Sequence, residues 1–219
     1  MFTEHLTLMR RLLNDDINSL DDSIAKRFYS KILPRIHKEL HINVEYFTDC
    51  LYLLDGRLKQ LHTFYVNVQL CTPQSLEMDS KKELIHMKCF SLTCEVEIMF
   101  YDESIVPLLH RMSNLEELFL NISIDRCIPD KSFLDGNDLK RDIINHMSKL
   151  NKFTFSIHSS LITDDLNELP SNENIQRSCK DLEDYQIVSY IHYFPAEGEG
   201  QCHIYSQPYT MNSLYWTYK

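Results

Sequence analysis

The sequence predicts an α/β solenoid with a curved, mainly parallel sheet, and two observations support this fold class. The first is a recurring apolar spacing in which two intervals of three residues lead into a strict alternation. The second is that helix-like segments stand between these recurring stretches. Together they indicate strand, turn and helix units that stack side by side.

Four stretches share the apolar spacing. They begin at Leu58, Leu84, Met112 and Met147, and in each the positions 0, 3, 6, 8 and 10 are apolar. The interval between apolar residues changes from three to two along each stretch. Apolar residues three apart indicate a turn or helix end that faces the core, and the alternation that follows indicates a strand with one buried face. The starts lie 26, 28 and 35 residues apart. The first two intervals fit a leucine-rich repeat, and the third implies an insertion at 128–138.

A weaker copy of the spacing precedes the four clear ones. It is Leu40-x-Ile42-x-Val44, and His37 stands where an apolar residue is expected three positions before it. We place the repeats at 36–160 within a single domain, 1–219. Residues 1–35 are expected to form a helical cap, and 161–219 a C-terminal helix and a β-hairpin cap. The hairpin arms are 186–194 and 201–209, which flank a glycine-containing loop.

The segments between the strands are predicted to be helical. They are 48–56, 75–87, 102–112, 136–147 and 171–182. Thr48 or Asp49 and Ser171 are the expected N-caps, and Gly56 follows the end of its helix. Pro107 is tolerated only near a first turn, so that helix is expected to start near Ser104.

Charge and cysteine usage limit the partners and the compartment. The chain has 22 basic and 32 acidic residues, a formal net charge of −10, which disfavours nucleic acid and anionic membrane surfaces. Seven cysteines occur without a C-x-x-C pair, as expected of free thiols in a reducing compartment. With neither a signal peptide nor a span of about 18 apolar residues, we expect a protein of the cytoplasm or nucleus.

The sequence lacks the motifs that most catalytic sites need. Only four glycines occur, and none belongs to a phosphate-binding loop, a dinucleotide-binding fingerprint or a nucleophile elbow. No H-E-x-x-H motif appears. We therefore predict a protein that is not an enzyme, with no catalytic residue and no cofactor.

Two groups of residues resemble metal ligands, and a simpler interpretation is favoured for each. His192, Cys202 and His203 lie on opposite arms of the predicted hairpin, where they are expected to be ordinary strand residues. An oxygen-rich loop does not follow the EF-hand order and is expected to cap and solvate the next helix. Its members are Asp130, Asp135, Asn137, Asp138 and Asp142. We predict no metal site.

The residues that alternate with the buried strand positions define the candidate binding surface. If the template residues point inward, these line the other face of the sheet, and stacking brings them together. Aromatic rings among hydroxyls and amides suit protein recognition. The candidates are Tyr65, Asn67, Ser91, Thr93, Phe119, Asn121, Thr154 and Ser156. The alternative is that a terminal segment covers Tyr65 and Phe119.

Four stretches together resemble a known family. They are FTDCLYLLDGRL (47–58), LLHRMSNLEELFL (108–120), LPSNENIQRS (169–178) and GQCHIYSQPY (200–209). The chain resembles the C-terminal part of F-box proteins with divergent leucine-rich repeats. The resemblance implies repeats that hold a protein substrate while an N-terminal F-box docks on the Skp1-like adaptor of a cullin ubiquitin ligase. No F-box motif is recognised in this sequence, so a Skp1-like adaptor is not an expected direct partner.

The sequence therefore predicts a protein–protein interaction scaffold. The resemblance implies a narrower role, substrate recognition for an F-box/cullin ubiquitin ligase. Two alternatives stay open: a small intracellular α/β enzyme of unknown reaction, and a truncated copy without a retained function.

Overall fold

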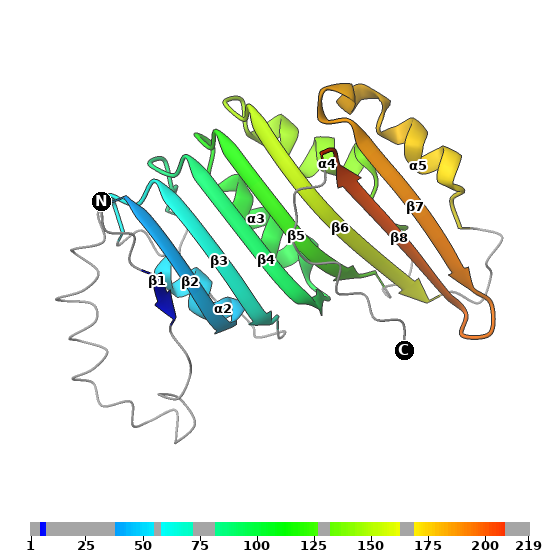
Figure 1. Ribbon diagram of the computed structural model, residues 1–219. Helices are drawn as coiled ribbons and strands as arrows, with labels where there is room; N and C mark the ends of the chain where they lie inside the picture. The colour runs from blue at the N-terminus through cyan, green and yellow to red at the C-terminus, as the bar shows by residue number, and fades with distance from the viewer. Residues whose placement is uncertain are drawn as a thin grey trace, which may run out of the picture.

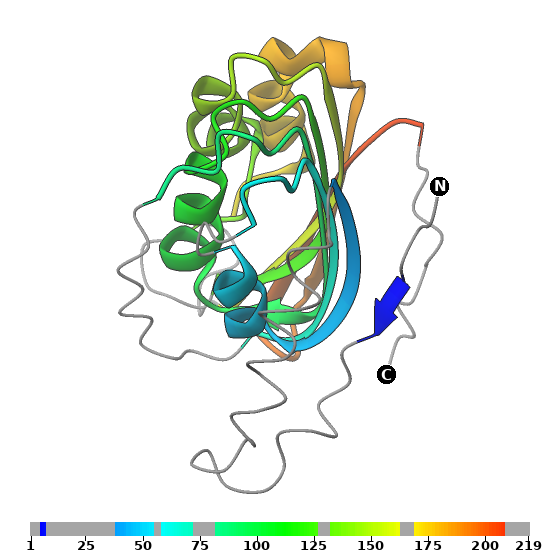
Figure 2. The same cartoon turned by 90° about the vertical axis from the view of Figure 1, so that its left-hand side faces the viewer.

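The computed structural model of the 219-residue chain describes residues 5–7, 38–54, 58–71, 82–126, 132–162 and 169–208. These residues form an α/β structure around one mixed sheet of eight strands. The described helices all lie on one side of the sheet (Figures 1 and 2). The hydrophobic core fills the space between the two layers.

The first six strands lie side by side in chain order. The strands are β1 His5–Thr7, β2 Glu39–Tyr46, β3 Thr63–Leu70, β4 Cys89–Ile98, β5 Glu117–Asp125, β6 Lys152–Ile162, β7 Ile187–Phe194 and β8 Glu199–Ser206. Each of β1 to β5 runs parallel to the next strand, up to β6, whereas β8 is antiparallel to both β6 and β7. The sheet is therefore mainly parallel, as the sequence predicts.

The recurring apolar positions stand in register across the sheet. Leu40 lies opposite Phe64, Phe64 opposite Phe90, Phe90 opposite Leu118, and Leu118 opposite Phe153. All five side chains are at most 4% exposed. The predicted strand positions are thus confirmed, including the weaker copy that begins the series.

The interval of three residues before each strand is one backbone turn. In all four clear copies the N–H at position 3 donates to the carbonyl at position 0, with an N–O distance of 3.0 Å: Leu61 to Leu58, Met87 to Leu84, Leu115 to Met112, and Leu150 to Met147. The next residue donates to the equivalent carbonyl of the preceding copy: His62 to Lys38, Lys88 to His62, Glu116 to Lys88, and Asn151 to Glu116. Each copy therefore positions the next one through the backbone.

The helices are short and occupy most of the predicted places. They are α2 Phe47–Leu53, the π-helix η4 Tyr101–Ile105, α3 Val106–His110, α4 Gly136–Asp142, the 3-10 turn η5 Ile144–His146, α5 Asn172–Ser178 and the 3-10 segment η7 Lys180–Tyr185. The predicted helix 136–147 stops at Asp142 and continues as η5. Near the predicted start at Ser104 the chain is a π-helix, and α3 begins at Val106 with Pro107 in its first turn.

Two of the predicted caps differ in outcome. Ser171 caps α5, where its Oγ accepts from the Asn174 N–H at 3.3 Å. The N-cap of α2 is Tyr46 rather than Thr48 or Asp49, and the Asp49 carboxylate instead accepts from the Tyr46 N–H at 3.3 Å. The prediction missed this because an aromatic residue is rare at an N-cap. Gly56 lies outside the described residues.

The predictions for 75–87 and for 1–35 fall largely outside the described residues. Of the first segment, 82–87 are described, and they form an irregular stretch with a turn rather than a helix. Of the second, His5–Thr7 are described, and they form a strand parallel to β2 rather than part of a helix. Pairing with an adjacent strand here overrides the helical spacing in the sequence.

The predicted C-terminal hairpin is confirmed, and its arms take an order that the sequence leaves undetermined. β8, the second arm, is paired with β6, while β7 lies at the end of the sheet (Figure 1). Cys202 and Ile204 of β8 are each 1% exposed and join the core. The hairpin thus covers the side of β6 that the parallel series leaves open.

Replacing Gly136 by alanine should destabilise the fold by about 1–3 kcal/mol. A Cβ there would collide with the Ser178 carbonyl oxygen and lie 2.7 Å from the Cys179 Cα, both backbone atoms. The control is Gly200→Ala, whose Cβ would meet the movable side-chain ends of Phe133 at 2.8 Å and Leu169 at 3.0 Å. Urea unfolding followed by circular dichroism should show the larger loss for Gly136→Ala. Equal losses would contradict the tight contact between α4 and α5.

Candidate protein-interaction face

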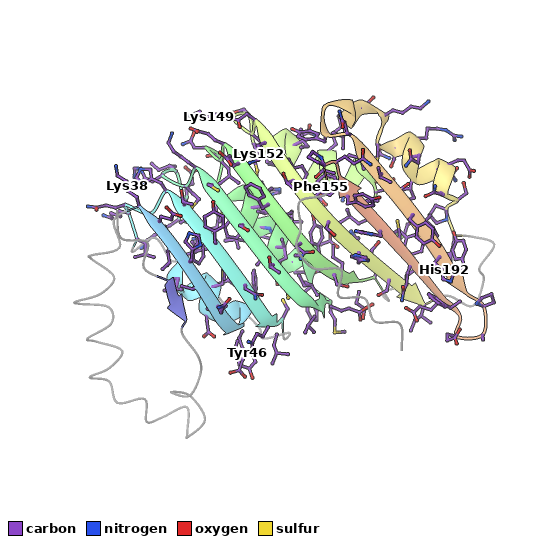
Figure 3. All side chains as sticks on the ribbon, viewed as in Figure 1. Lys38, Tyr46, Lys149, Lys152, Phe155 and His192 are labelled. Atoms are coloured by element: carbon purple, nitrogen blue, oxygen red, sulfur yellow. The ribbon has the colours of Figure 1, made fainter. Side chains whose placement is uncertain are left out.

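The face of the sheet opposite the helices, here called the front face, carries all eight candidate residues predicted from the sequence. It is turned toward the viewer in Figure 3. Strand register sorts the eight into two rows: Tyr65, Ser91, Phe119 and Thr154 in the first, and Asn67, Thr93, Asn121 and Ser156 in the second. The predicted stacking of these residues is therefore what the parallel register produces.

The rows continue onto two strands, β2 and β8, on which the sequence analysis named no candidate binding residue. His41 lies opposite Tyr65, and Asn43 lies opposite Asn67, because β2 joins the parallel series. At the other end, Tyr205 of β8 lies opposite Ser156. The apolar spacing of 40–44 was the signal for the first two residues, whereas no sequence pattern fixed which hairpin arm meets β6.

Tyr65 is held in place by its neighbours in the first row. Its ring stacks on His41 with the centroids 4.2 Å apart, and its hydroxyl accepts from the Cys89 thiol at a distance of 3.6 Å. Burial, together with the Cys89 contact, raises the pKa of Tyr65 to about 12. The ring is half-buried, so Tyr65 offers a fixed, neutral phenol at this surface.

Phe119 lies beneath a cation. The Lys152 ammonium is 4.8 Å from the centroid of the ring and 3.5 Å from the Glu117 carboxylate. Such a cation–π contact contributes about 0.5–1 kcal/mol at an exposed site, a small amount to displace. The Phe119 ring itself is half-buried, and part of it stays accessible beside the Lys152 side chain.

The second row is uncharged and polar. Asn67, Thr93 and Asn121 are half-buried, and their amides and hydroxyl can donate or accept hydrogen bonds. Ser156 differs, because it is 1% exposed and its Oγ lies 3.0 Å from the His203 Nε2. Ser156 therefore supports its neighbours within the sheet rather than presenting its hydroxyl to a partner.

A pair of stacked histidines continues the front face beyond the second row. His158 of β6 lies opposite His203 of β8, and their ring centroids are 3.7 Å apart. Burial and the neighbouring His203 lower the pKa of His158 to about 3, and burial lowers the pKa of His203 to about 4. Sequence reasoning missed the pair because the contact depends on β8 pairing with β6.

The geometry of this region does not favour hydrolysis. Ser156 and His203 form a hydroxyl–imidazole contact, the first requirement for an activated nucleophile. A substrate must also reach the nucleophile, and Ser156 is nearly fully buried.

The two sets of residues that resemble metal ligands are arranged for other roles. Cys202 faces the core, whereas His203 lies on the front face, so the hairpin set does not converge. In the oxygen-rich loop, the Asp135 carboxylate accepts from the Asn137 and Asp138 N–H groups at 2.8 and 3.0 Å, as an N-cap does. Within the described ranges no three potential ligands gather at one point, and Asp130 falls outside those ranges.

Comparisons with family models, with curated proteins and with solved structures found no significant match to this chain. Across the part of the chain that the structure describes, no helix has the length and apolar character needed to cross a bilayer. Any functional assignment therefore rests on the residues and the geometry described above.

The stacked histidines should make stability fall as the pH falls from about 6.5 toward 4. Both pKa values are lower in the folded chain than the ordinary value of 6.5, so the unfolded chain binds more protons in this range. Replacing His158 by glutamine should flatten this dependence, measured as the free energy of unfolding in urea at pH 7 and pH 5. The control is His86→Gln, in an exposed turn. Equal pH dependences for wild type and His158→Gln would contradict the buried pair.

Proposed function

We propose that the chain is a leucine-rich-repeat-like solenoid that acts as a protein-interaction module and binds its partner on the front face. Apart from the buried Ser156, the two rows consist of half-buried aromatic, amide and hydroxyl groups. They carry this proposal, because they stand in register on a face that no described helix covers. The solenoid assignment is supported by the turn and the hydrogen bond to the preceding copy that recur before four strands.

The chemistry of the front face suits a protein partner better than a small molecule. Ligand sites for small molecules are concave and enclose most of their ligand, whereas the two rows lie along a sheet. Rings fixed by stacking lose little conformational freedom on binding, and amides adapt their hydrogen bonds to the partner. The net charge of −10 favours a partner whose matching surface is basic.

A narrower proposal follows from the resemblance to F-box proteins with divergent repeats. The front face would then hold the substrate of a cullin ubiquitin ligase, and the chain would take no part in the chemistry. Affinity capture of the chain from its native cell, followed by identification of the bound proteins, tests this directly. Recovery of a Skp1-like adaptor supports the ligase role, and a stable partner without any adaptor supports an independent scaffold.

The alternatives make different demands on the structure. A small enzyme needs accessible titratable groups that converge, and the hydroxyl–imidazole contact between Ser156 and His203 ends at a buried hydroxyl. A truncated copy without function predicts no specific partner at all. We also propose a location in the cytoplasm or nucleus, which the six free cysteines of the described ranges support.

Replacing Tyr65 and Phe119 together by alanine should reduce partner capture at least tenfold while leaving the fold intact. The variant removes the two rings of the first row, and large aromatic anchors carry much of the energy of a protein interface. The matched control is Ile85→Ala, which removes an exposed apolar side chain (46% exposed) in the turn before β4. Capture is measured by quantitative pull-down and folding by circular dichroism. Unchanged capture by the folded double variant would exclude the front face.

A further inference from the structure

The sheet ends on one side with β7, whose sequence lacks the charged residues and prolines that commonly protect an edge strand from pairing. β7 spans eight residues, Ile187–Phe194, and contains no lysine, arginine, aspartate, glutamate, proline or glycine. Natural edge strands are usually short, charged or interrupted by proline, because an open edge pairs with other chains. The opposite end of the sheet follows that rule, since β1 has three residues.

The backbone of β7 has one strand neighbour. It pairs along its length with β8, and apart from the Glu197 N–H, which donates to the Phe194 carbonyl at 3.1 Å, no backbone hydrogen bond joins it to any other described segment. In an antiparallel ladder the N–H and C=O groups of alternate residues point away from the partner strand. About half of the polar backbone groups of β7 therefore face outward.

α5 packs against β7 through side chains and leaves this backbone edge unpaired. The Ser189 hydroxyl donates to the Asn172 side chain at 2.9 Å, and the Tyr193 hydroxyl donates to the Pro170 carbonyl at 2.7 Å. Ser189 is buried, and the other seven residues of β7 are half-buried or exposed. A strand without charged residues that leaves most of its side chains partly exposed is typical of a surface that contacts another chain.

The side chains on the front face of β7 form a row of rings along the strand. Tyr190 is 59% exposed and stacks toward His192, with ring centroids 6.4 Å apart, and His192 meets Phe194 edge-on at 4.4 Å. Figure 3 labels His192 on β7 at the end of the sheet. Ring side chains on the front face therefore reach the last strand of the sheet.

We propose that β7 is a homodimerisation edge, at which two copies of the chain pair their β7 strands antiparallel and join their sheets into one. A two-fold axis perpendicular to the sheet keeps each face on the same side, so residues of the same face meet. In the two central registers Tyr190 faces either Tyr190 or His192 of the other copy, and ring pairs of this kind stabilise cross-strand contacts. The pairing is self-complementary because no charged side chain of β7 repels its own copy.

The size of the edge sets the expected affinity. Eight residues span about 27 Å, and the pairing of two such strands buries less surface than the roughly 1,200–2,000 Å² of a stable interface. The chain also carries a net charge of −10, so two copies repel each other at long range. We therefore expect a dissociation constant in the micromolar range that decreases as salt screens this repulsion.

Sedimentation equilibrium of the full 219-residue chain between about 2 and 200 μM tests the proposal. The expected result is a monomer–dimer equilibrium that shifts toward dimer between 50 and 500 mM sodium chloride. Tyr190→Lys should weaken association at least tenfold, because in either register it places two cations, one from each copy, close to the two-fold axis. His192→Lys, at an exposed position on the same strand, is the second variant and should weaken association in the same way.

The matched control is Ile162→Lys, which adds the same charge at a residue 65% exposed at the end of the inner strand β6. It should leave the dimer unchanged. A chain that stays monomeric at 200 μM overturns the proposal. So does a dimer that persists in both folded β7 variants, or one that weakens as salt rises, since the latter would indicate attraction between opposite charges elsewhere.

Discussion

The register of the parallel strands is the constraint on which the rest of the molecule depends. Leu40, Phe64, Phe90, Leu118 and Phe153 lie opposite one another and are almost completely buried. Because side chains alternate along a strand, a slip of one residue would turn each of these side chains to the front face. The core and the composition of the front face are thus fixed by the same register.

The backbone turns reinforce that register at the start of each strand. A carbonyl in each copy accepts from an N–H of the next, so the backbone of one copy fixes where its successor begins. The series cannot continue indefinitely, and the reversed strand β8 ends it by pairing antiparallel with β6. β7 is therefore the edge strand at this end of the sheet, and it contains no charged residue. An edge of this kind is where a sheet is most open to pairing with another chain.

The sequence predicted the parts of the fold that depend on local periodicity. The apolar spacing located the turns and strands from Leu58 onward, and the same alternation located the two rows of the front face. It could not predict that β8 rather than β7 meets β6, because the two hairpin arms have similar apolar character. The His158–His203 pair and the burial of Ser156 follow from that choice, so they too were beyond reach of the sequence.

The helices were predicted less well for a related physical reason. Each is only about one to two turns long, and helices of that length are held by packing rather than by their own propensity. The chain forms the π-helix η4 at 101–105 and a non-helical stretch at 82–87, where the sequence predicts α-helix. The strands, whose buried faces are specified residue by residue, were the more predictable layer.

The most direct test of the proposed binding face is site-specific photo-crosslinking in the native cell. A photoreactive residue is placed at Thr93, in the middle of the front face, or at Glu103, exposed on η4 in the helical layer. The front-face interpretation predicts a discrete cross-linked partner from position 93 and none from position 103. Cross-linking from position 103 alone would contradict it.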